Sequence, residues 1–187
     1  STKISGRTGS GTGLGLLQSI ATAEEDTSLV SYTVAVVDQN LPNNGYVTTS
    51  GTMVVREGDG YDAWVQAAQF ELRNRDNTWS FTGNGAINQK FNASPSEDDE
   101  GHSYGVGIQK ISGNFTFDAG HYLESESYDP NDLGFLAAPN EISSFATFNY
   151  RTFEPRGRFN RLRAFISVDH NQIETPRTFD NWGLEIG

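Results

Sequence analysis

The stretch Asn114–Gly120 reads NFTFDAG, and its apolar and polar side chains alternate without a break. In an extended chain, Phe115, Phe117 and Ala119 fall on one face, whereas Asn114, Thr116 and Asp118 fall on the other. Successive side chains of a β-strand point to opposite sides of the sheet, so this period of two predicts a strand with one apolar and one polar face.

The same period recurs around residues 31–36, 78–88 and 161–169, where Phe165 breaks the pattern of the last segment. No segment keeps a helical period over three turns. We therefore predict an all-β fold, an antiparallel up-and-down meander of about 10–12 long strands. The expected strands are residues 2–8, 12–22, 28–39, 45–56, 61–73, 77–91, 102–111, 114–126, 141–153, 158–170 and 178–186.

These strands are long for a globular protein, in which a strand typically has about five or six residues. A tilted strand that crosses a bilayer needs about 9–11 residues. The expected connections also differ between the two ends of the meander. Those at 9–11, 41–45, 74–77, 112–113 and 154–157 are tight, and those at 22–27, 92–101, 128–140 and 171–177 are longer. This asymmetry favours a transmembrane β-barrel, or part of a larger one, with turns at one end and loops at the other.

Composition narrows the function classes. The chain has 187 residues, 13 basic against 24 acidic side chains and a net charge of −11, which argues against a nucleic-acid-binding protein. The absence of cysteine excludes disulfide scaffolds and thiol nucleophiles from this chain. A hydrophobic content of 35% agrees with a barrel, because only every second residue of a strand would face lipid.

Charge follows the same division between the two ends. Acidic residues gather in the longer connections, including the run at 97–100, and basic residues gather near the tight turns. Aromatic residues recur near the strand ends, as the interfacial girdles of a membrane barrel require. Gln66 and His121 fit poorly, because each shares an otherwise apolar strand face.

Two other interpretations stay open. A soluble secreted β-sandwich or lectin-like binding module also alternates, but it buries its apolar face between two sheets. A barrel hydrolase that uses loop carboxylates is the third interpretation. No G-x-S-x-G motif is present, and His102, His121 and His170 lack metal-ligand spacing, so we assign no catalytic residue.

The connection after residue 123 is rich in oxygen-bearing side chains. Its candidates for ligand binding are Tyr128, Asp129, Asn131, Asp132 and Phe135. A candidate calcium site, the one cofactor site considered, comprises Glu124, Glu126, Asp129 and Asp132, because calcium prefers such oxygens. Their spacing does not match an EF-hand, and a proline-containing loop whose side chains bond the local backbone explains the same residues.

Charged side chains also mark the polar strand faces. Arg161 and Arg163 share the polar face of one expected strand, and Arg151 lies on that of the preceding strand. If this face lines a lumen, the three arginines form a basic ladder beside Asp118 and Asp169. Such a ladder tunes pore selectivity or locks a filled lumen through ion pairs, and we favour the second role.

Several motifs carry a family resemblance over most of the chain. They are Lys3–Gly9 (KISGRTG), Gly13–Leu17 (GLGLL), Phe70–Asn74 (FELRN), Ser112–Thr116 (SGNFT) and Glu124–Phe135 (ESESYDPNDLGF). In this order they resemble the barrel region of a Bacteroidota outer-membrane β-barrel family of unknown function, whose members carry an N-terminal carbohydrate-binding module of the family-nine type. The segment 128–135 is the most specific part of the resemblance.

The resemblance implies a location in the bacterial outer membrane, with membrane lipid as a partner. It also implies contact with other outer-membrane or periplasmic proteins and with glycans, in a surface-exposed channel or scaffold for glycan binding or uptake. The carbohydrate-binding module is absent from these residues, so no carbohydrate site is carried over. We expect residues 1–187 to form a single segment that is an incomplete portion of a larger barrel.

Overall fold

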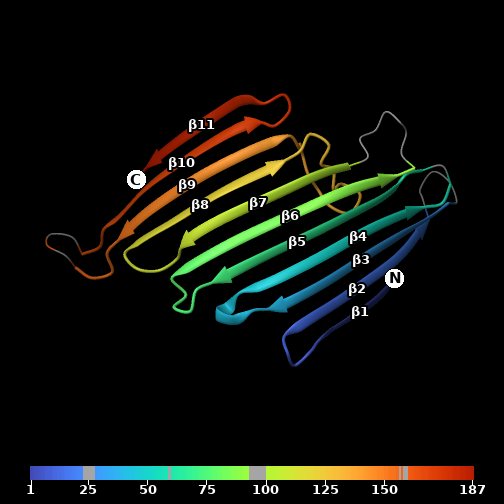
Figure 1. Cartoon of the computed structure of the whole chain (residues 1–187), viewed down its shortest axis with the longest axis horizontal. Coiled ribbons are helices and arrows are strands. Elements are labelled where there is room, and N and C mark those ends of the chain that lie inside the picture. The colour runs from blue at the N-terminus through green and yellow to red at the C-terminus, as the bar shows by residue number, and fades with distance from the viewer. Residues whose placement is uncertain (23–27, 59, 93–99, 156, 158–159) are drawn as a thin grey trace.

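A computed structural model describes residues 1–22, 28–58, 60–92, 100–155, 157 and 160–187. These residues form one antiparallel sheet in which each strand pairs with the next along the chain (Figure 1). A short 3-10 helix, η1 (Pro42–Asn44), lies in the link between the third and fourth strands. The strands are β1 (Thr2–Arg7), β2 (Thr12–Thr22), β3 (Leu29–Asn40), β4 (Tyr46–Arg56), β5 (Asp62–Arg73), β6 (Trp79–Phe91), β7 (Glu100–Lys110), β8 (Phe115–Glu124), β9 (Glu141–Arg151), β10 (Arg163–Ile173) and β11 (Thr178–Ile186).

The all-β meander is confirmed, and most strand limits lie within two residues of those expected. The segment expected at 158–170 is wrong, because β10 pairs with β9 from Arg163 to Ile173. The link 152–162 is therefore longer than the tight turn expected at 154–157, and 174–177 is tighter than expected. Hydrogen bonds between Thr152 and Leu162 close the longer link just before β10 begins.

Side-chain hydrogen bonds and backbone conformation within a few residues explain the tight turn between β5 and β6. In the β5–β6 turn, the Asn74 side-chain oxygen accepts hydrogen bonds from the backbone nitrogens of Thr78 at 2.8 Å and Trp79 at 2.9 Å. Asn77 in the same turn has a φ of 51°, a left-handed conformation that asparagine tolerates better than most residues. A turn of fixed geometry sets the register of the two strands it joins, and hence which face each side chain occupies.

The register separates the side chains onto two faces. One row of paired residues crosses all eleven strands and defines the polar face: Arg7, Gly13, Asp38, Thr48, Gln69, Asn84, Gly105, Tyr122, Ser143, Asn171 and Asn181. Residues one position along each strand occupy the opposite, apolar face, which includes Leu14, Val37, Phe81, Ile108, Phe148 and Leu184.

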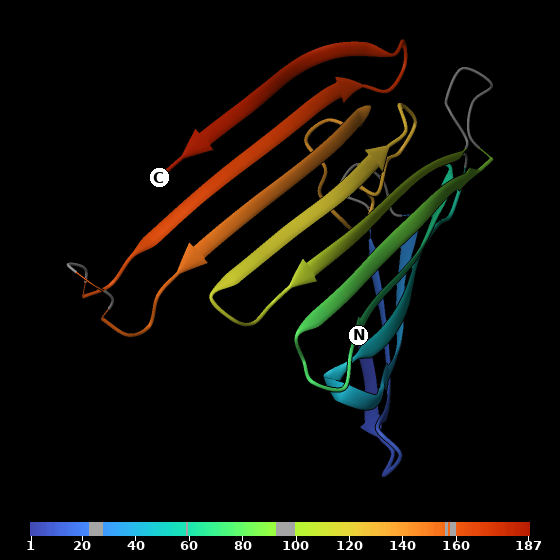
Figure 2. The same cartoon turned by 60° about the vertical axis from the view of Figure 1, so that its left-hand side comes forward.

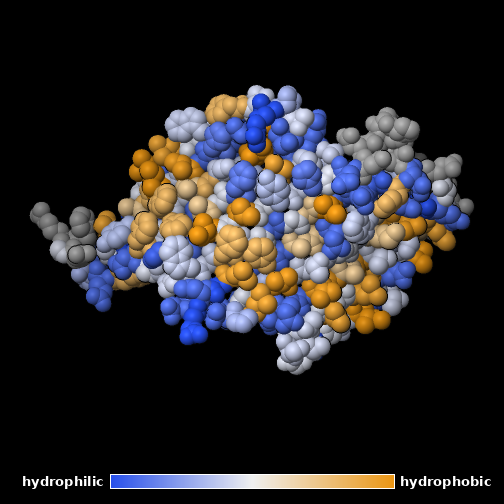
Figure 3. Space-filling model, in the orientation of Figure 1, coloured by the Kyte–Doolittle hydropathy of each residue, from blue (hydrophilic) through white to orange (hydrophobic). Residues whose placement is uncertain are grey.

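The apolar face is the more exposed of the two faces. On β7, the polar-face glycines 101, 105 and 107 are buried, whereas Val106 and Ile108 on the apolar face are 45% and 44% exposed. Phe115 and Ile166 are likewise exposed on the apolar face. Among the described residues, no second sheet covers this face. Figure 3 shows hydrophobic and aromatic side chains crowded over the middle of the visible surface.

The described strands do not close into a barrel. The sheet is strongly curved (Figure 2), yet β1 and β11 do not pair, so it has two open edges. A complete barrel, one of the two forms expected, is therefore not formed by these strands. In the described part of the chain, no helix is long and apolar enough to span a membrane.

The polar residues that fitted poorly on the apolar face have partners there. Gln66 Nε2 donates hydrogen bonds to Thr49 Oγ1 at 2.7 Å and to the Ser50 carbonyl oxygen at 2.9 Å. His121 Nδ1 lies 2.8 Å from Ser144 Oγ on β9. Pairing removes most of the cost of placing such groups in an apolar environment.

Aromatic rings concentrate at the tight-turn end of the apolar face. Trp79 and Phe117 meet edge to face with ring centroids 5.4 Å apart, and Phe115 stacks on Phe148 at 6.3 Å. Tyr122, an aromatic residue near the end of β8, does not join this group: it lies on the polar face, where its ring stacks on that of Phe145 with centroids 6.1 Å apart. Its ring covers Gly105 on β7, where any side chain would collide with it.

Candidate functional site

The segment 125–140, which joins β8 to β9, folds back over the polar face instead of extending away from the sheet (Figures 1 and 2). The Asp129 backbone nitrogen donates a hydrogen bond to Asn88 Oδ1 at 3.0 Å, and Ser127 Oγ donates one to the Glu100 carbonyl oxygen at 2.7 Å. A β-carbon on Gly101 would collide with the Ser127 carbonyl oxygen, so close contact requires glycine there. We call residues 125–140 the docked segment.

Two ion pairs hold the docked segment to strands that are distant in sequence. Lys90 Nζ at the end of β6 lies 3.0 Å from Asp129 Oδ2, and Arg56 at the end of β4 pairs with Asp132. Tyr61 joins the two pairs, because its ring lies 4.6 Å from the Arg56 guanidinium carbon and 5.1 Å from Lys90 Nζ. These five residues form the docking cluster. Its cations come from the sheet and its carboxylates from the docked segment.

The pKa of Asp129 reflects this arrangement. Burial by itself would raise its pKa, but hydrogen bonds from Lys90 and from the Asn131 backbone outweigh burial and lower the pKa below its usual value. Burial, with the nearby Asp132 charge, raises the pKa of Tyr61. Asp129 therefore stays ionised, and Tyr61 stays neutral, throughout the neutral pH range.

Asn131 gives the docked segment its shape. Its Oδ1 accepts a hydrogen bond from the Leu136 nitrogen at 2.6 Å, and its Nδ2 donates one to the Leu136 carbonyl oxygen at 3.2 Å. Its backbone nitrogen donates to Asp129 Oδ1 at 3.1 Å. These bonds match the proline-containing loop described above as the alternative to a ligand site.

The remaining candidates of this segment lie apart. Tyr128 lines a cavity of about 300 Å³ on the polar face, together with Thr48, Gln69 and Ser103. The Phe135 side chain, in contrast, is 89% exposed and contacts no part of that cavity. Of the five predicted residues, Asp129, Asn131 and Asp132 hold the segment, and Tyr128 faces the sheet.

The structure does not gather the four residues considered for calcium. Asp129 and Asp132 are each paired with a cation, and Glu124 ends β8 opposite Glu141 on β9. Among the described residues, no group of three or more histidine, cysteine, aspartate or glutamate side chains is placed to hold a metal ion. Asp129 and Asp132 are thus engaged in docking, and the four carboxylates do not share a coordination sphere.

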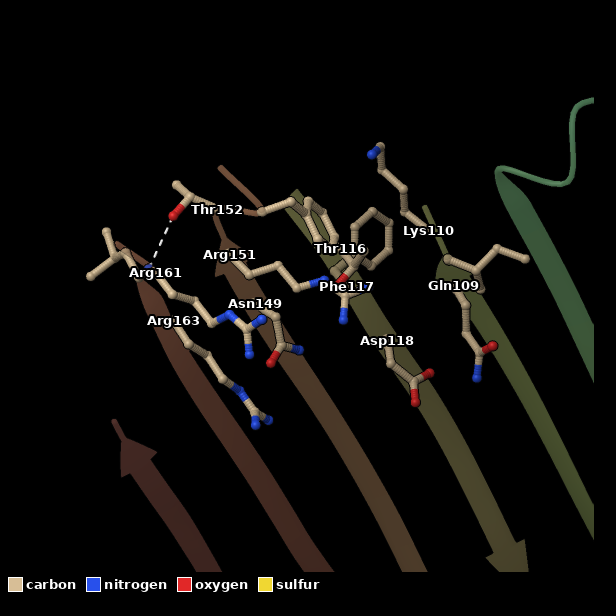
Figure 4. Close-up of a pocket in the computed structure, with 13 residues that line it drawn as sticks. Gln109, Lys110, Thr116, Phe117, Asp118, Asn149, Arg151, Thr152, Arg161 and Arg163 are labelled. Carbon is tan, nitrogen blue, oxygen red and sulfur yellow. Dashed lines mark hydrogen bonds between the residues drawn. The ribbon is translucent and has the colours of Figure 1, made fainter. Parts of the chain in front are cut away.

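A second concavity lies at the opposite, tight-turn end of the sheet. Its volume is about 640 Å³, and its lining includes Asp118, Asn149 and the predicted arginines 151, 161 and 163 (Figure 4). Two expectations need correction. Arg161 lies in the link before β10 and not within the strand. Asp169 is well along β10, opposite Phe145, and does not line this concavity.

The expected ion pairs of the basic ladder are also absent from the part of the chain that the structure describes. The salt bridges there join Arg7 to Asp38, Arg56 to Asp132, Arg73 to Glu71 and Lys90 to Asp129. None involves Arg151, Arg161 or Arg163, and the Arg151 guanidinium lies over the Phe153 ring at 4.8 Å. The three arginines are close together without a carboxylate bound to any of them.

Sequence reasoning missed the sheet side of the docking cluster. Arg56 and Lys90 were not singled out, and Tyr61 was noted only as one of the aromatic residues near the strand ends, although all three lie at the same end of the meander as the acidic connections. Their location at strand ends beside an acidic segment was a usable signal. Which acidic connection folds inward, however, depends on contacts between residues as far apart as 56 and 132.

Comparison with known proteins places the chain in one family. The family described as "Domain of unknown function (DUF5916)" matches residues 1–187. The chain belongs to this family. No curated protein and no solved structure significantly resembles it. The family description assigns no activity, so functional inference rests on the geometry of the DUF5916 chain itself.

Proposed function

We propose that this DUF5916 chain supplies membrane-spanning strands of an outer-membrane β-barrel, in which the polar face lines a lumen and the docked segment narrows it. The observation that carries the proposal is the exposed apolar face of the curved sheet, opposite a polar face that is more buried. A membrane barrel has this arrangement, because its outer surface contacts lipid and its interior is polar. A soluble sheet would bury the apolar face instead.

Strand dimensions support the same proposal. β10 has 11 residues, which at about 3.3 Å per residue spans about 36 Å. At a tilt of about 40° the strand covers about 28 Å along the membrane normal, close to the apolar band of about 25 Å in such barrels. The aromatic group around Trp79 and Phe148 would then lie at one interface.

The docked segment suggests a selective channel and not a wide pore. It crosses the polar face near the longer-loop end and brings Tyr128, Asp129 and Asp132 over β4 to β7. Loops that fold into a barrel reduce its aqueous cross-section. The link to glycan uptake, to the outer membrane and to Bacteroidota rests on the resemblance of the motifs at 3–17 and 124–135, and it is part of the proposal.

The alternative functions receive less support from the geometry. A sandwich or lectin-like module requires a second sheet over Val106 and Ile108, and the described strands form a single sheet. A hydrolase that used Asp129 or Asp132 would need a carboxylate free for proton transfer. Both side chains are instead ion-paired with Lys90 and Arg56.

Cysteine labelling tests the proposal directly, because this chain contains no cysteine of its own. Asn84→Cys on β6 and Val106→Cys on β7 form a matched pair: both positions are exposed on neighbouring strands, but they lie on opposite faces. In the full-length protein reconstituted in vesicles, we expect a water-soluble maleimide to label the Asn84→Cys variant directly and the Val106→Cys variant only after detergent is added. Equal labelling of both variants in vesicles, or a monodisperse protein without detergent, would refute the membrane placement.

A further inference from the structure

The basic concavity at the tight-turn end carries a local excess of positive charge. Its lining includes three arginines, Arg151, Arg161 and Arg163, against the single carboxylate of Asp118. Lys110 also borders the concavity, but its Nζ donates hydrogen bonds to the Ser112 and Phe115 carbonyl oxygens, both at 2.7 Å, and points away from the arginines (Figure 4). The chain as a whole has a net charge of −11. A local excess of positive charge in an acidic protein focuses anions toward that place.

The state of the arginines sets this concavity apart from the other charged positions. Cations on the polar face elsewhere, such as Arg7, Arg56 and Lys90, are each bound to a carboxylate. Within the described residues, neither a carboxylate nor a hydrogen-bond acceptor is bound to the guanidinium of Arg161 or Arg163. Guanidinium groups keep their charge at all physiological pH values, so their mutual repulsion is not relieved by deprotonation.

Three separate parts of the fold bring these groups together. Arg151 ends β9, Arg163 begins β10 directly opposite it, and Arg161 comes from the link between them. Figure 4 shows the Arg161 and Arg163 side chains extending in the same direction, toward Asn149 on β9. The Thr152 hydroxyl accepts a hydrogen bond from the Leu162 nitrogen at 3.0 Å and holds the link that carries Arg161 against the strand.

We infer that this concavity is a binding site for a solute that carries an oxyanion group, such as a carboxylate, sulfate or phosphate. Guanidinium groups bind such groups with two parallel hydrogen bonds, a geometry that a lysine ammonium cannot reproduce. The Asn149 and Gln109 side chains supply neutral hydrogen-bonding groups in the same concavity for the uncharged part of the solute. Asp118 limits the affinity, because its negative charge opposes the ligand.

The test measures binding of sodium sulfate to the full-length purified protein by isothermal titration calorimetry at constant ionic strength. Sulfate is fully ionised and has no titration of its own near neutral pH. We expect Arg163→Gln to weaken sulfate binding about tenfold, the effect of losing one charged hydrogen bond. Arg163→Lys keeps the charge but loses the paired geometry, and it is expected to fall between Arg163→Gln and the unmodified protein.

Two further variants keep the result interpretable. Arg75→Gln makes the same charge change in the β5–β6 turn, at the same end of the sheet but outside the concavity, and should leave sulfate affinity unchanged. Asp118→Asn should strengthen binding about threefold by removing a like charge, a gain that misfolding cannot produce. Glucose, which is neutral, should not bind to the arginines.

The inference is overturned by an absence of sulfate binding, by equal losses in Arg163→Gln and Arg75→Gln, or by weaker binding in Asp118→Asn. Binding is measured in solution and does not require insertion into a membrane. If the protein binds sulfate at this site but fails the cysteine-labelling test, the anion site is supported and the barrel proposal is refuted. If it passes the labelling test but does not bind sulfate, the barrel proposal is supported and the anion site is refuted.

Discussion

Val168 offers the sharpest test of which solvent the apolar face contacts. It lies at the centre of β10 (Arg163–Ile173), is 39% exposed and pairs with Ala146 and Leu184 on the neighbouring strands. If β10 crosses a membrane as proposed, this position falls near the bilayer midplane. We expect Val168→Arg to cost about 2–4 kcal/mol of folding free energy, the penalty for arginine on the lipid face at that depth.

Ala164 provides a matched control on the same face of the same strand. It lies about 13 Å from Val168 along the strand, or about 10 Å nearer the rim when the strand is tilted by about 40°. Because the penalty for a charge falls toward the interface, Ala164→Arg should cost only about 0–1 kcal/mol. The expected difference between the two variants is about 2 kcal/mol.

The assay is reversible urea unfolding of the full-length protein into and out of lipid vesicles, followed by tryptophan fluorescence. Val168→Leu controls for packing and should be nearly neutral, because the side chain remains apolar. If the face contacts water, an arginine at a 39% exposed position should change stability by no more than about 0.5 kcal/mol. Equal effects of Val168→Arg and Ala164→Arg would therefore refute the lipid-facing assignment.

Three other predictions concern the docked segment, with hydrogen exchange of its amides as the common measurement. Gly101→Ala should displace the segment, because the new β-carbon would collide with the Ser127 carbonyl oxygen. In the control variant Gly85→Ala, the nearest atom to the new β-carbon is the Ser103 carbonyl oxygen at 3.6 Å, so this change should be tolerated. Equal exchange in both variants would contradict the contact. Asp129→Asn should weaken docking by about 1 kcal/mol, a roughly fivefold faster exchange, because it breaks the pair with Lys90; unchanged exchange would count against the pair. Since the pKa of Asp129 lies below its ordinary 3.8, its contribution is complete above that pH and is lost as the pH falls through the lower folded value. Protection of the amides, which is their exchange rate relative to that of an unfolded chain at the same pH, should therefore decrease only in strong acid, and a loss of protection as the pH is lowered from about 7 to 5 would contradict this assignment.

Much of the sheet was predictable because strand periodicity is a local property. The alternation around Phe115 and Phe117 gave the correct strand and the correct face, and the tight turn at Asn74 was recognisable from its residues. The limits of β10 were harder to predict, because Leu162 continues the alternation but precedes the residues of β10 that pair with β9. Tyr122 shows a similar limit: an aromatic near a strand end suggested an interface, yet its register places it on the polar face.

The candidate sites were predictable only in part. Asp129 and Asp132 were singled out as ligand residues, because the sequence does not show that Lys90 and Arg56 lie opposite them. The arginines 151, 161 and 163 line one concavity with Asp118, whereas Asp169 lies elsewhere and the ion pairs expected to lock the arginines are not present among the described residues. Pairing depends on side-chain distances of a few ångströms, which strand patterns do not fix.

By itself, the sequence determined that this chain forms long antiparallel strands with one apolar and one polar face, because side-chain direction alternates with every residue. Only the tertiary structure decided which face is covered. Alternation is identical for a soluble sheet and a membrane sheet, and the difference lies in curvature and in where the segment 125–140 folds. That segment docks on the polar face through contacts between distant residues, and the apolar face is left exposed.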